Sequence, residues 1–477
     1  MRHNLEREVK LQAPVGFLLP DLPGTPAGPR RFTSTYFDTE DLRLAGHGIT
    51  LRRRVENRRG LWQLKIPQGK RDRREVEEPG GPSGPPRSLS ALLVASLRGA
   101  KLIPVAKLRT VRTGVMVVSA GGRRVAEVAL DAVQALNGTR VVKRFTEIEV
   151  ELLDGDESDL QATVAILKSA GAYTGDERAK ALQVLDLGRP GKVDRRPESD
   201  LAQVQAFIQE QFDAIVGHDA GTRVGADPED LHQQRVGIRK LRSLLRAADL
   251  LDPQWSAWLG RELEWIGDAL NPVRDLDVMI PYLSEDLGLL PAEDSWALRP
   301  LLTHLRAEHT EARERMLEAL ESDRYLQLLD TVEEATRSIK VRPCDAELRS
   351  GAVRRFAKLR KAVRNLPEPP GEEELHRVRR LAKKARYAAE IVLPGEGKAA
   401  AVFMKKMKVL QDLLGDLQDA SVAEGRIRGY LPHAQDPQTS FALGRLAELQ
   451  AAKKRNAKAR FGPAWKAVNR SGKKAWM

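Results

Sequence analysis

The sequence has little of what marks secreted, membrane-spanning or base-stacking proteins. Its 477 residues include one cysteine, Cys344, so a disulfide framework is excluded. No apolar run reaches the roughly 18 residues that a membrane-spanning helix needs, and no signal-type apolar segment is present. Aromatic residues make up only 5% of the chain. These absences predict a cytoplasmic protein with no membrane partner.

Basic residues outnumber acidic ones. The chain has 79 Lys and Arg against 66 Asp and Glu, a net charge of +13. Such a balance favours anionic partners, which include nucleic acid, polyphosphate and membrane surfaces. With few aromatics and no base-reading motif, nucleic acid is the least favoured of them. The length corresponds to about three domains at roughly 150 residues each.

The chain changes character near its first third. Residues 1–152 contain short segments rich in β-branched residues, such as "RRFTSTYFDT" and "RFTEIEVELL", separated by Gly and Pro turns. From "ESDLQATVAILKSAGAY" onward, apolar residues recur every three or four positions, which is typical of helices. We therefore expect an α+β multidomain protein: an all-β sheet or barrel domain over 1–187, a polar linker over 188–198, and an all-α remainder.

The helical part contains an internal repeat. His232, followed by basic residues at +3, +7 and +10, recurs 144 residues later as His376 with the same basic pattern. Asp268 and Asp275 recur as Asp412 and Asp419 at the same offset. Two tandem helical bundles, over 199–335 and 336–460, are the simplest architecture. The remaining 461–477 is expected to be a flexible basic tail.

Several predicted strands alternate charged with apolar residues. "EREVK" places Glu6, Glu8 and Lys10 on one face, and "TEIEVEL" does the same for its glutamates. If the apolar faces pack outward, the charged faces line one interior that holds both acids and bases. Carboxylates suit Mg²⁺ or Mn²⁺, and Lys and Arg suit phosphate oxygens, so the mixture indicates a metal-bridged polyanion. The alternative is a solvated sheet face with cross-strand ion pairs.

The order of these motifs resembles the CYTH family, the triphosphate tunnel metalloenzymes. "LEREVKL", "YFDT", "LAGHGITLRRR", "WQLKIP", "RREVE", "ALD" and "EIEVEL" follow one another as in that family, over roughly 2–187. The resemblance implies an eight-stranded antiparallel β tunnel that binds a triphosphate with one or two divalent metals. Members hydrolyse inorganic triphosphate or thiamine triphosphate, or cyclise ATP.

The same resemblance implies residue roles. The catalytic set would be Glu6, Glu8 and Lys10, with the choice of catalytic base left open. Metal binding is expected of Glu6, Glu8, Asp131, Glu147 and Glu149. Phosphate binding is expected of Arg52, Arg54, Lys65, Arg73, Arg109, Arg178 and Lys180. The segment "GDERAKALQVL" follows the family pattern only loosely, with Lys180 the best-placed base in it.

Each copy of the helical repeat carries one narrow basic stripe. At about 100° per residue, offsets of 0, 3, 7 and 10 fall within an arc of roughly 80°. A solvated helix face is the alternative for a single stripe, but its duplication favours a polyanion site. Metal binding by His232 or His376 is disfavoured, because no His or Cys follows at i+4. Asp275 and Asp419 either pair with the stripes or brace helices.

This half resembles the CHAD domain, a conserved histidine α-helical domain often joined to CYTH modules. The likeness runs over about 199–460 and depends on "LHQQRVGIRKLRSLL", "VRDLDV", "LHRVRRLAKKARYAAE" and "LLGDLQD". It implies polyphosphate binding on basic helical surfaces. The expected contacts are His232, Arg235, Arg239, Lys240, Arg242, His376, Arg379, Lys383, Lys384 and Arg386.

Together these features predict a metal-dependent triphosphatase, with Mg²⁺ or Mn²⁺, coupled to a polyphosphate-binding module. Its partners would be inorganic triphosphate and polyphosphate, and its location the cytoplasm, in association with polyphosphate granules. The alternatives are a non-catalytic polyphosphate-binding or targeting protein, an adenylyl cyclase and a nucleic-acid binder. The sequence does not fix the oligomeric state.

Overall fold

The structure is a computed structural model, which describes residues 2–14, 16–69, 72–176, 178–185, 199–248, 250–341, 348–393 and 397–477. The expected linker over 188–198 lies outside the described residues. The chain divides into two compact units. The first comprises Met1–Val193 with Asp219–Ala226, and the second comprises Asp194–His218 with Asp227–Met477.

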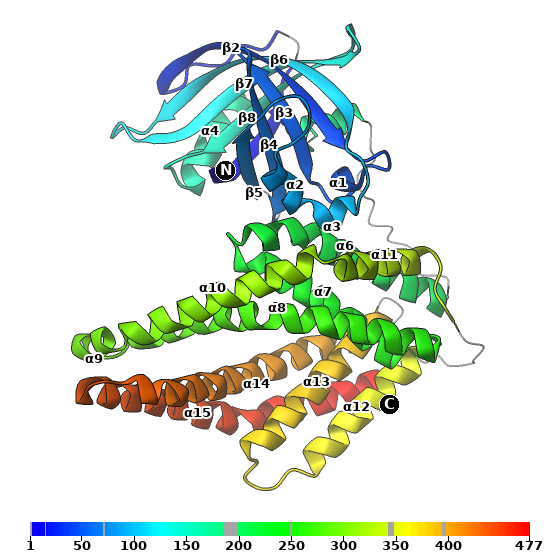
Figure 1. The fold of residues 1–477 in the computed structure, drawn as a ribbon, viewed down its shortest axis with the longest axis vertical. Coiled ribbons are helices and arrows are strands. Elements are labelled where there is room, and N and C mark those ends of the chain that lie inside the picture. The colour runs from blue at the N-terminus through cyan, green and yellow to red at the C-terminus, as the bar shows by residue number, and fades with distance from the viewer. Residues whose placement is uncertain are drawn as a thin grey trace. The chain divides into compact units, whose positions relative to one another are not determined.

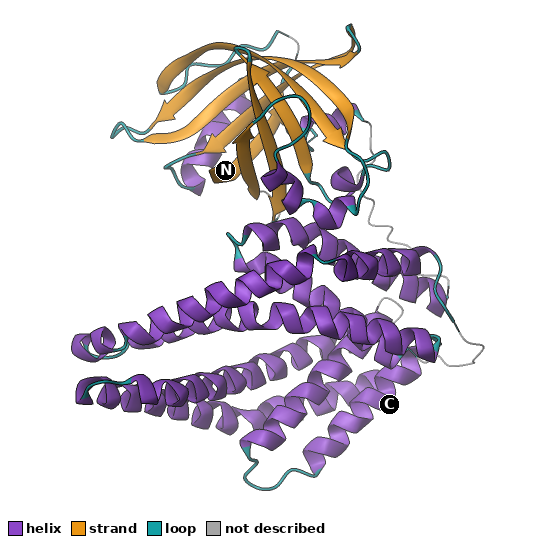
Figure 2. Cartoon of the chain, in the orientation of Figure 1, coloured by secondary structure: helices purple, strands orange, loops and turns teal. Residues whose placement is uncertain are grey.

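The first unit is a closed barrel of eight antiparallel strands (Figures 1 and 2). Its strand order is β1-β5-β4-β3-β2-β6-β7-β8, so consecutive strands mostly pair as hairpins while β1 closes the sheet between β5 and β8. The strands are β1 (Arg2–Gln12), β2 (Gly24–Asp38), β3 (Thr50–Glu56), β4 (Arg59–Gln68), β5 (Asp72–Pro79), β6 (Ile103–Val118), β7 (Arg124–Asn137) and β8 (Arg140–Leu152). The predicted eight-stranded tunnel is confirmed.

Apolar strand faces point outward and are covered by short helices. On one side, Ile148 and Val150 pack with Leu160 of α4 (Glu157–Ser169). On another, Trp62 and Leu64 pack among residues of α1 (Arg43–Gly46), α2 (Arg87–Leu92) and α3 (Val94–Leu97). Fully burying one such side chain stabilises the fold by about 1.5–3 kcal/mol. Because these outer faces form the cores, the charged faces line the enclosed interior, and the solvated-sheet alternative is wrong.

One end of the barrel is filled by apolar side chains. Tyr36, Leu108 and Val133 form a buried cluster with Ala181 of α5 (Lys180–Val184). At the other end, near the β3–β4 turn, the interior opens into a cavity of about 1000 Å³. Its lining includes Arg30, Arg54, Glu56, Gln63 and Glu77. The tunnel therefore has an apolar floor and a charged mouth.

The second unit is helical, and its element bounds follow the repeat. The helices are α6 (Asp200–Val224, whose end lies in the first unit), α7 (Pro228–Ala247), α8 (Pro253–Leu287), α9 (Ala292–Ala297), α10 (Arg299–Glu321), α11 (Asp323–Arg337), α12 (Leu348–Arg364), α13 (Glu372–Val392), α14 (Lys398–Tyr430) and α15 (Pro437–Trp476), with a 3₁₀ turn at Leu431–His433. α7 and α13 begin 144 residues apart (228 and 372), in agreement with the offset of the motifs. α7 packs on α8, α13 packs on α14, and α7 and α13 pack on each other. The predicted all-α region is confirmed, and its division into two bundles over 199–335 and 336–460 stays a prediction. None of the described helices is long and apolar enough to cross a membrane.

Three of these helices begin with the same two-residue signal. An Asp side chain at the N-cap accepts a hydrogen bond from a backbone N–H of the first turn, and Pro occupies the first helical position. Pro suits that position because its fixed φ is helical and the missing N–H has no partner there anyway. The pairs are Asp227–Pro228, Asp252–Pro253 and Asp436–Pro437.

The predicted flexible tail is wrong. Residues 461–477 are the last turns of α15, where Val468 and Trp476 are buried. The Trp476 ring meets Phe403 edge-on, with 5.7 Å between centroids, and Phe403 in turn meets Phe356 at 5.2 Å. The basic residues of this segment are the exposed face of an amphipathic helix, whose buried face includes Val468, Ser471, Gly472, Ala475 and Trp476.

Replacing Trp476 by Ala should destabilise the helical unit by about 3–5 kcal/mol, because the change leaves a cavity beside the ring of Phe403. Urea unfolding followed by circular dichroism measures the loss. Lys474→Ala, at an exposed position of the same turn, is the control and should change little. Equal stability of both variants would mean that the segment does not pack.

Candidate active site and basic helical surface

The first strand brings two acids and a base into the barrel. Glu6 is 7% exposed, and its Oε2 accepts a hydrogen bond from Lys65 Nζ at 2.5 Å. Glu8 lies 3.3 Å from Lys10 Nζ and 3.8 Å from Arg73 Nε. The strand alternation predicted from "EREVK" thus places all three side chains inside, where acids and bases alternate across neighbouring strands.

A second cluster surrounds Lys180, the first residue of α5. Its Nζ lies 2.5 Å from Glu149, 2.8 Å from Glu147 and 2.9 Å from Asp131, and its side chain is 6% exposed. Burial would lower the pKa of Lys180, but the three carboxylates raise it well above the usual value. Lys180 is therefore a permanent cation that joins β7, β8 and α5.

Arg112 completes this cluster, and the sequence reasoning missed it. Its guanidinium donates to both oxygens of Asp131 at 2.8 and 2.7 Å, and to Glu149 at 2.6 Å. Arg109, predicted in its place, is wrong: it is exposed on the outer face of β6, three positions from Arg112 and therefore on the opposite side. "LRTVRTG" offers both arginines, and only the register of β6 against Asp131 on β7 selects Arg112.

The predicted phosphate-binding arginines divide between the tunnel and its rim. Arg52 donates to Gln63 at 2.9 Å and to the Tyr36 hydroxyl at 3.1 Å, inside the barrel. Arg54 stacks over Phe32 and shares Glu56 with Arg30 at the mouth. Arg178 does not join them: it pairs with Asp176 on its own loop, at 2.5 Å.

Toward the mouth, carboxylates crowd without enough cations. Burial raises the pKa of both Glu6 and Glu151 to about 7. The charge of Glu75 adds to the rise for Glu6, and the charge of Glu6 adds to the rise for Glu151. Burial would also raise the pKa of Glu8, but Lys10 lowers it below its usual value. Glu151 pairs with Glu8 in the β8–β1 register and was not among the predicted site residues, although "TEIEVEL" includes it. This end of the interior has a deficit of positive charge.

The predicted metal-binding acids therefore belong to two groups. Asp131, Glu147 and Glu149 converge on the cations Lys180 and Arg112, and the described residues contain no group of three or more Asp, Glu, His or Cys side chains that could hold a metal ion. Mg²⁺ and Mn²⁺ commonly take only one or two carboxylates, with water and substrate phosphates completing their coordination. Glu6, Glu8 and Glu151, hard oxygen donors in a region short of cations, fit such an ion. The donor chemistry thus favours the mouth side of the tunnel.

In the helical unit, the two basic stripes come together where α7 packs on α13. Burial, and then Arg379, Arg239 and Arg235, lowers the pKa of Lys383 to about 7. The buried Nε atoms of Arg239 and Arg379 have no hydrogen-bond partner. Arg235 donates to Asn271 and lies 3.8 Å from Asp275. Cations from both copies therefore share one region in which the acids Asp275 and Asp419 are outnumbered.

The remaining predicted contacts are arranged differently. Lys240 is ion-paired with Glu390, and Arg242 with Glu264. Lys384 is exposed, and burial followed by Arg246 and Arg355 lowers its pKa. Three further residues lie along the stripes. Burial, and then the charge of Arg274, lowers the pKa of His232. His376 is hydrogen-bonded to Gln418, and the guanidinium of Arg386 lies over the ring of Tyr387.

Comparison with known proteins matches both units. The model of the CYTH domain matches residues 4–182, and that of the CHAD domain matches residues 206–428. The Mycobacterium tuberculosis protein Rv2226 is 30% identical over 455 residues, which cover 88% of this chain and 86% of that protein. PptA from Streptomyces chartreusis has a TM-score of 0.49 at 22% identity, covering 56% of this chain and 99% of that chain. The CHAD domain from the plant Ricinus communis has a TM-score of 0.46 at 23% identity, covering 58% and 97%.

Proposed function

Because the chain belongs to the family of proteins in which a CYTH domain precedes a CHAD domain, we propose a function for each domain. The barrel hydrolyses inorganic triphosphate or the ends of short polyphosphate chains, with Mg²⁺ or Mn²⁺. The helical domain binds polyphosphate. The observation that carries the first proposal is a closed interior in which both acids and bases are buried on one continuous surface.

The interior cations suit a triphosphate. Lys10, Arg52, Lys65 and Arg73 reach the interior from β1, β3, β4 and β5, so a bound chain would meet positive charge on several sides. A divalent ion held by one or two of the acids Glu6, Glu8 and Glu151 would neutralise developing charge on the phosphate oxygens. The fixed side chains orient the chain and exclude bulk water, which is the main protein contribution to phosphoryl transfer.

The first experiment measures phosphate release from tripolyphosphate by the purified protein with Mg²⁺ or Mn²⁺, with ATP and thiamine triphosphate as parallel substrates. Release that requires the metal supports the proposal. Cyclic AMP as a product would establish the cyclase alternative. No turnover of any of these, with tripolyphosphate retained, would establish a non-catalytic binding protein.

Unmatched charge supports the second proposal. Bringing Arg235, Arg239, Arg379 and Lys383 together costs free energy that a bound polyanion would return. Tethering such a module to the barrel raises the local concentration of chains near the tunnel. Competition between long polyphosphate and duplex DNA for the protein, at several salt concentrations, separates this proposal from nucleic-acid binding.

Polyphosphate binding should weaken several-fold as the pH rises from about 6 to about 8, because Lys383 loses its charge through its pKa of about 7. The groups around it are Arg235, Arg239, Arg379 and Asp419. Binding curves for the wild type and Lys383→Arg measure the effect. Since arginine stays charged throughout, the variant should bind with a flatter pH profile. An equal pH dependence in both proteins would contradict the role of Lys383.

A further inference from the structure

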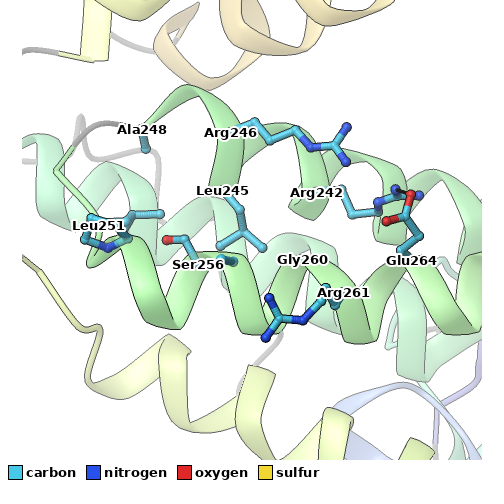
Figure 3. A pocket seen from close by; sticks show the side chains of 11 residues that line it. Arg242, Leu245, Arg246, Ala248, Leu251, Ser256, Gly260, Arg261 and Glu264 are labelled. Carbon is cyan, nitrogen blue, oxygen red and sulfur yellow. Dashed lines mark hydrogen bonds and ion pairs between the residues drawn. The ribbon is translucent and has the colours of Figure 1, made fainter.

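A pocket of about 520 Å³ lies in the helical unit between the end of α7 and the beginning of α8 (Figure 3). Its walls include Arg242 and Arg246 from α7, and Arg261 and Glu264 from α8. We name it the arginine pocket. Its volume is that of an ordinary small-molecule site. Of the residues expected to contact polyphosphate, only Arg242 belongs to it.

The pocket carries more positive than negative charge. The lining contains three guanidinium groups and one carboxylate, that of Glu264, which is ion-paired with Arg242. Among the described residues, Arg246 and Arg261 form no ion pair or side-chain hydrogen bond; the acid near Arg261 is Glu262, which pairs with Arg324. Three arginines and one glutamate give the lining a formal charge of +2, which balances the charge of about −2 on a phosphate monoester at neutral pH.

Two polar groups of the lining lack partners. The Oγ of Ser256 and the Nε of Arg242 are buried with no hydrogen-bond partner. Serines elsewhere in these helices, such as Ser284 and Ser471, donate to the carbonyl four residues earlier. A buried polar atom without a partner costs about 1–3 kcal/mol. An anionic ligand in the pocket would accept from both groups.

The rest of the lining is apolar. Leu245, Leu251 and Ala257 line the pocket together with Ala248 and Pro253. An inorganic phosphate chain gains nothing from such a surface, whereas a ligand with an apolar body buries area against it. The chemistry therefore differs from that of the stripes on α7 and α13, where cations predominate.

The second copy of the repeat keeps basic residues in place of Arg242 and Arg261, as Arg386 and Lys405, but not the other polar features of the pocket. At the offset of 144 residues, Gly260 becomes Met404 and Ser256 becomes Ala400. Arg246 becomes Glu390, which pairs with Lys240. Because the duplicated packing does not require these residues, their presence in the first copy is not explained by the repeat.

From the excess charge, the unpartnered donors and the apolar wall, we infer that the arginine pocket binds a small organic phosphate. The phosphoryl group lies among Arg242, Arg246 and Arg261, and the apolar body lies on the leucine side. This site is distinct from the tunnel and shares only Arg242 with the expected polyphosphate contacts.

The test titrates the full chain with 2-naphthyl phosphate by calorimetry, in the presence of a chelator so that no metal-dependent hydrolysis occurs. Inorganic phosphate, tripolyphosphate and 2-naphthoate are titrated in parallel. The naphthyl ester should bind at one site and about tenfold more tightly than inorganic phosphate or 2-naphthoate, a difference of about 1.4 kcal/mol, and tripolyphosphate, whose proposed sites lie elsewhere, should displace it only weakly. Tripolyphosphate displacing it with equal affinity would overturn the inference.

Gly260→Met gives the matched variant. A Cβ at Gly260 meets nothing within 4 Å, so the new side chain enters the pocket without a backbone clash, and Met is the residue at the equivalent position, 404, of the other copy. It should weaken naphthyl phosphate binding by about tenfold or more. The control is Gly425→Met, at an exposed position of α14 where an added Cβ also meets nothing within 4 Å. Should Gly260→Met fail to fold, Arg261→Gln tests the same site, and unchanged binding in it would overturn the inference.

Discussion

Glu8→Gln is expected to lower metal-dependent phosphate release from tripolyphosphate by about 100- to 1000-fold, the usual effect of removing one preorganised charged group from an active site. Glu8 is buried between Lys10 and Arg73, and Lys10 holds its pKa below the ordinary value, so it is an anion at neutral pH. The amide keeps the shape but loses that charge. Initial rates at saturating Mg²⁺ or Mn²⁺ measure the loss.

Two observations complete this test. Glu40→Gln, at an exposed position outside the barrel interior, should retain the wild-type rate. Polyphosphate binding by Glu8→Gln should also be unchanged, because the proposed surface lies in the other unit. Equal loss of turnover and of polyphosphate binding would contradict the assignment of the two activities to two domains.

Lys180→Met is expected to destabilise the barrel by about 3–5 kcal/mol, because it leaves three buried carboxylates short of a cation. Without Lys180, the pKa values of these carboxylates rise. Protonation then relieves the repulsion at mildly acidic pH, so the deficit in unfolding free energy should shrink as the pH falls from about 7.5 to about 5. Urea unfolding of both proteins at several pH values measures it.

The control is Lys107→Met, which removes an exposed lysine from β6. Surface changes of this kind are usually worth less than about 0.5 kcal/mol. A pH-independent deficit in Lys180→Met would mean that packing, and not charge, accounts for the loss. No deficit would mean that the Lys180 cluster does not exist in solution.

Strand alternation and motif order were sufficient to predict the barrel. Glu6, Glu8 and Lys10 had to share a face, and outward apolar residues such as Leu64 required cover. The helical repeat was also predictable, because the motifs on α7 and α13 recur at one offset of 144 residues. What sequence could not supply was strand register, which decides between Arg109 and Arg112.

The division of the acids was also beyond the sequence. By residue type, the acids near Lys180, which are Asp131, Glu147 and Glu149, do not differ from the acids near the mouth. Only the position of α5 brings Lys180 into contact with them. Similarly, the basic residues of segment 461–477 suggested a solvated tail, but its helix is stabilised by long-range contacts to Phe403 that no local pattern shows. Both cases depend on residues far apart in the chain.

The apolar floor of the barrel gives a final consequence. A phosphate chain cannot thread through a tube that is blocked at one end by Tyr36, Leu108 and Ala181, so under the proposed hydrolase activity substrate would enter and product would leave by the same opening. Such a chamber would act on chain termini and not on internal bonds of a long polymer. Each cleavage would then be followed by escape past the incoming chain, which would make hydrolysis distributive and subject to product inhibition.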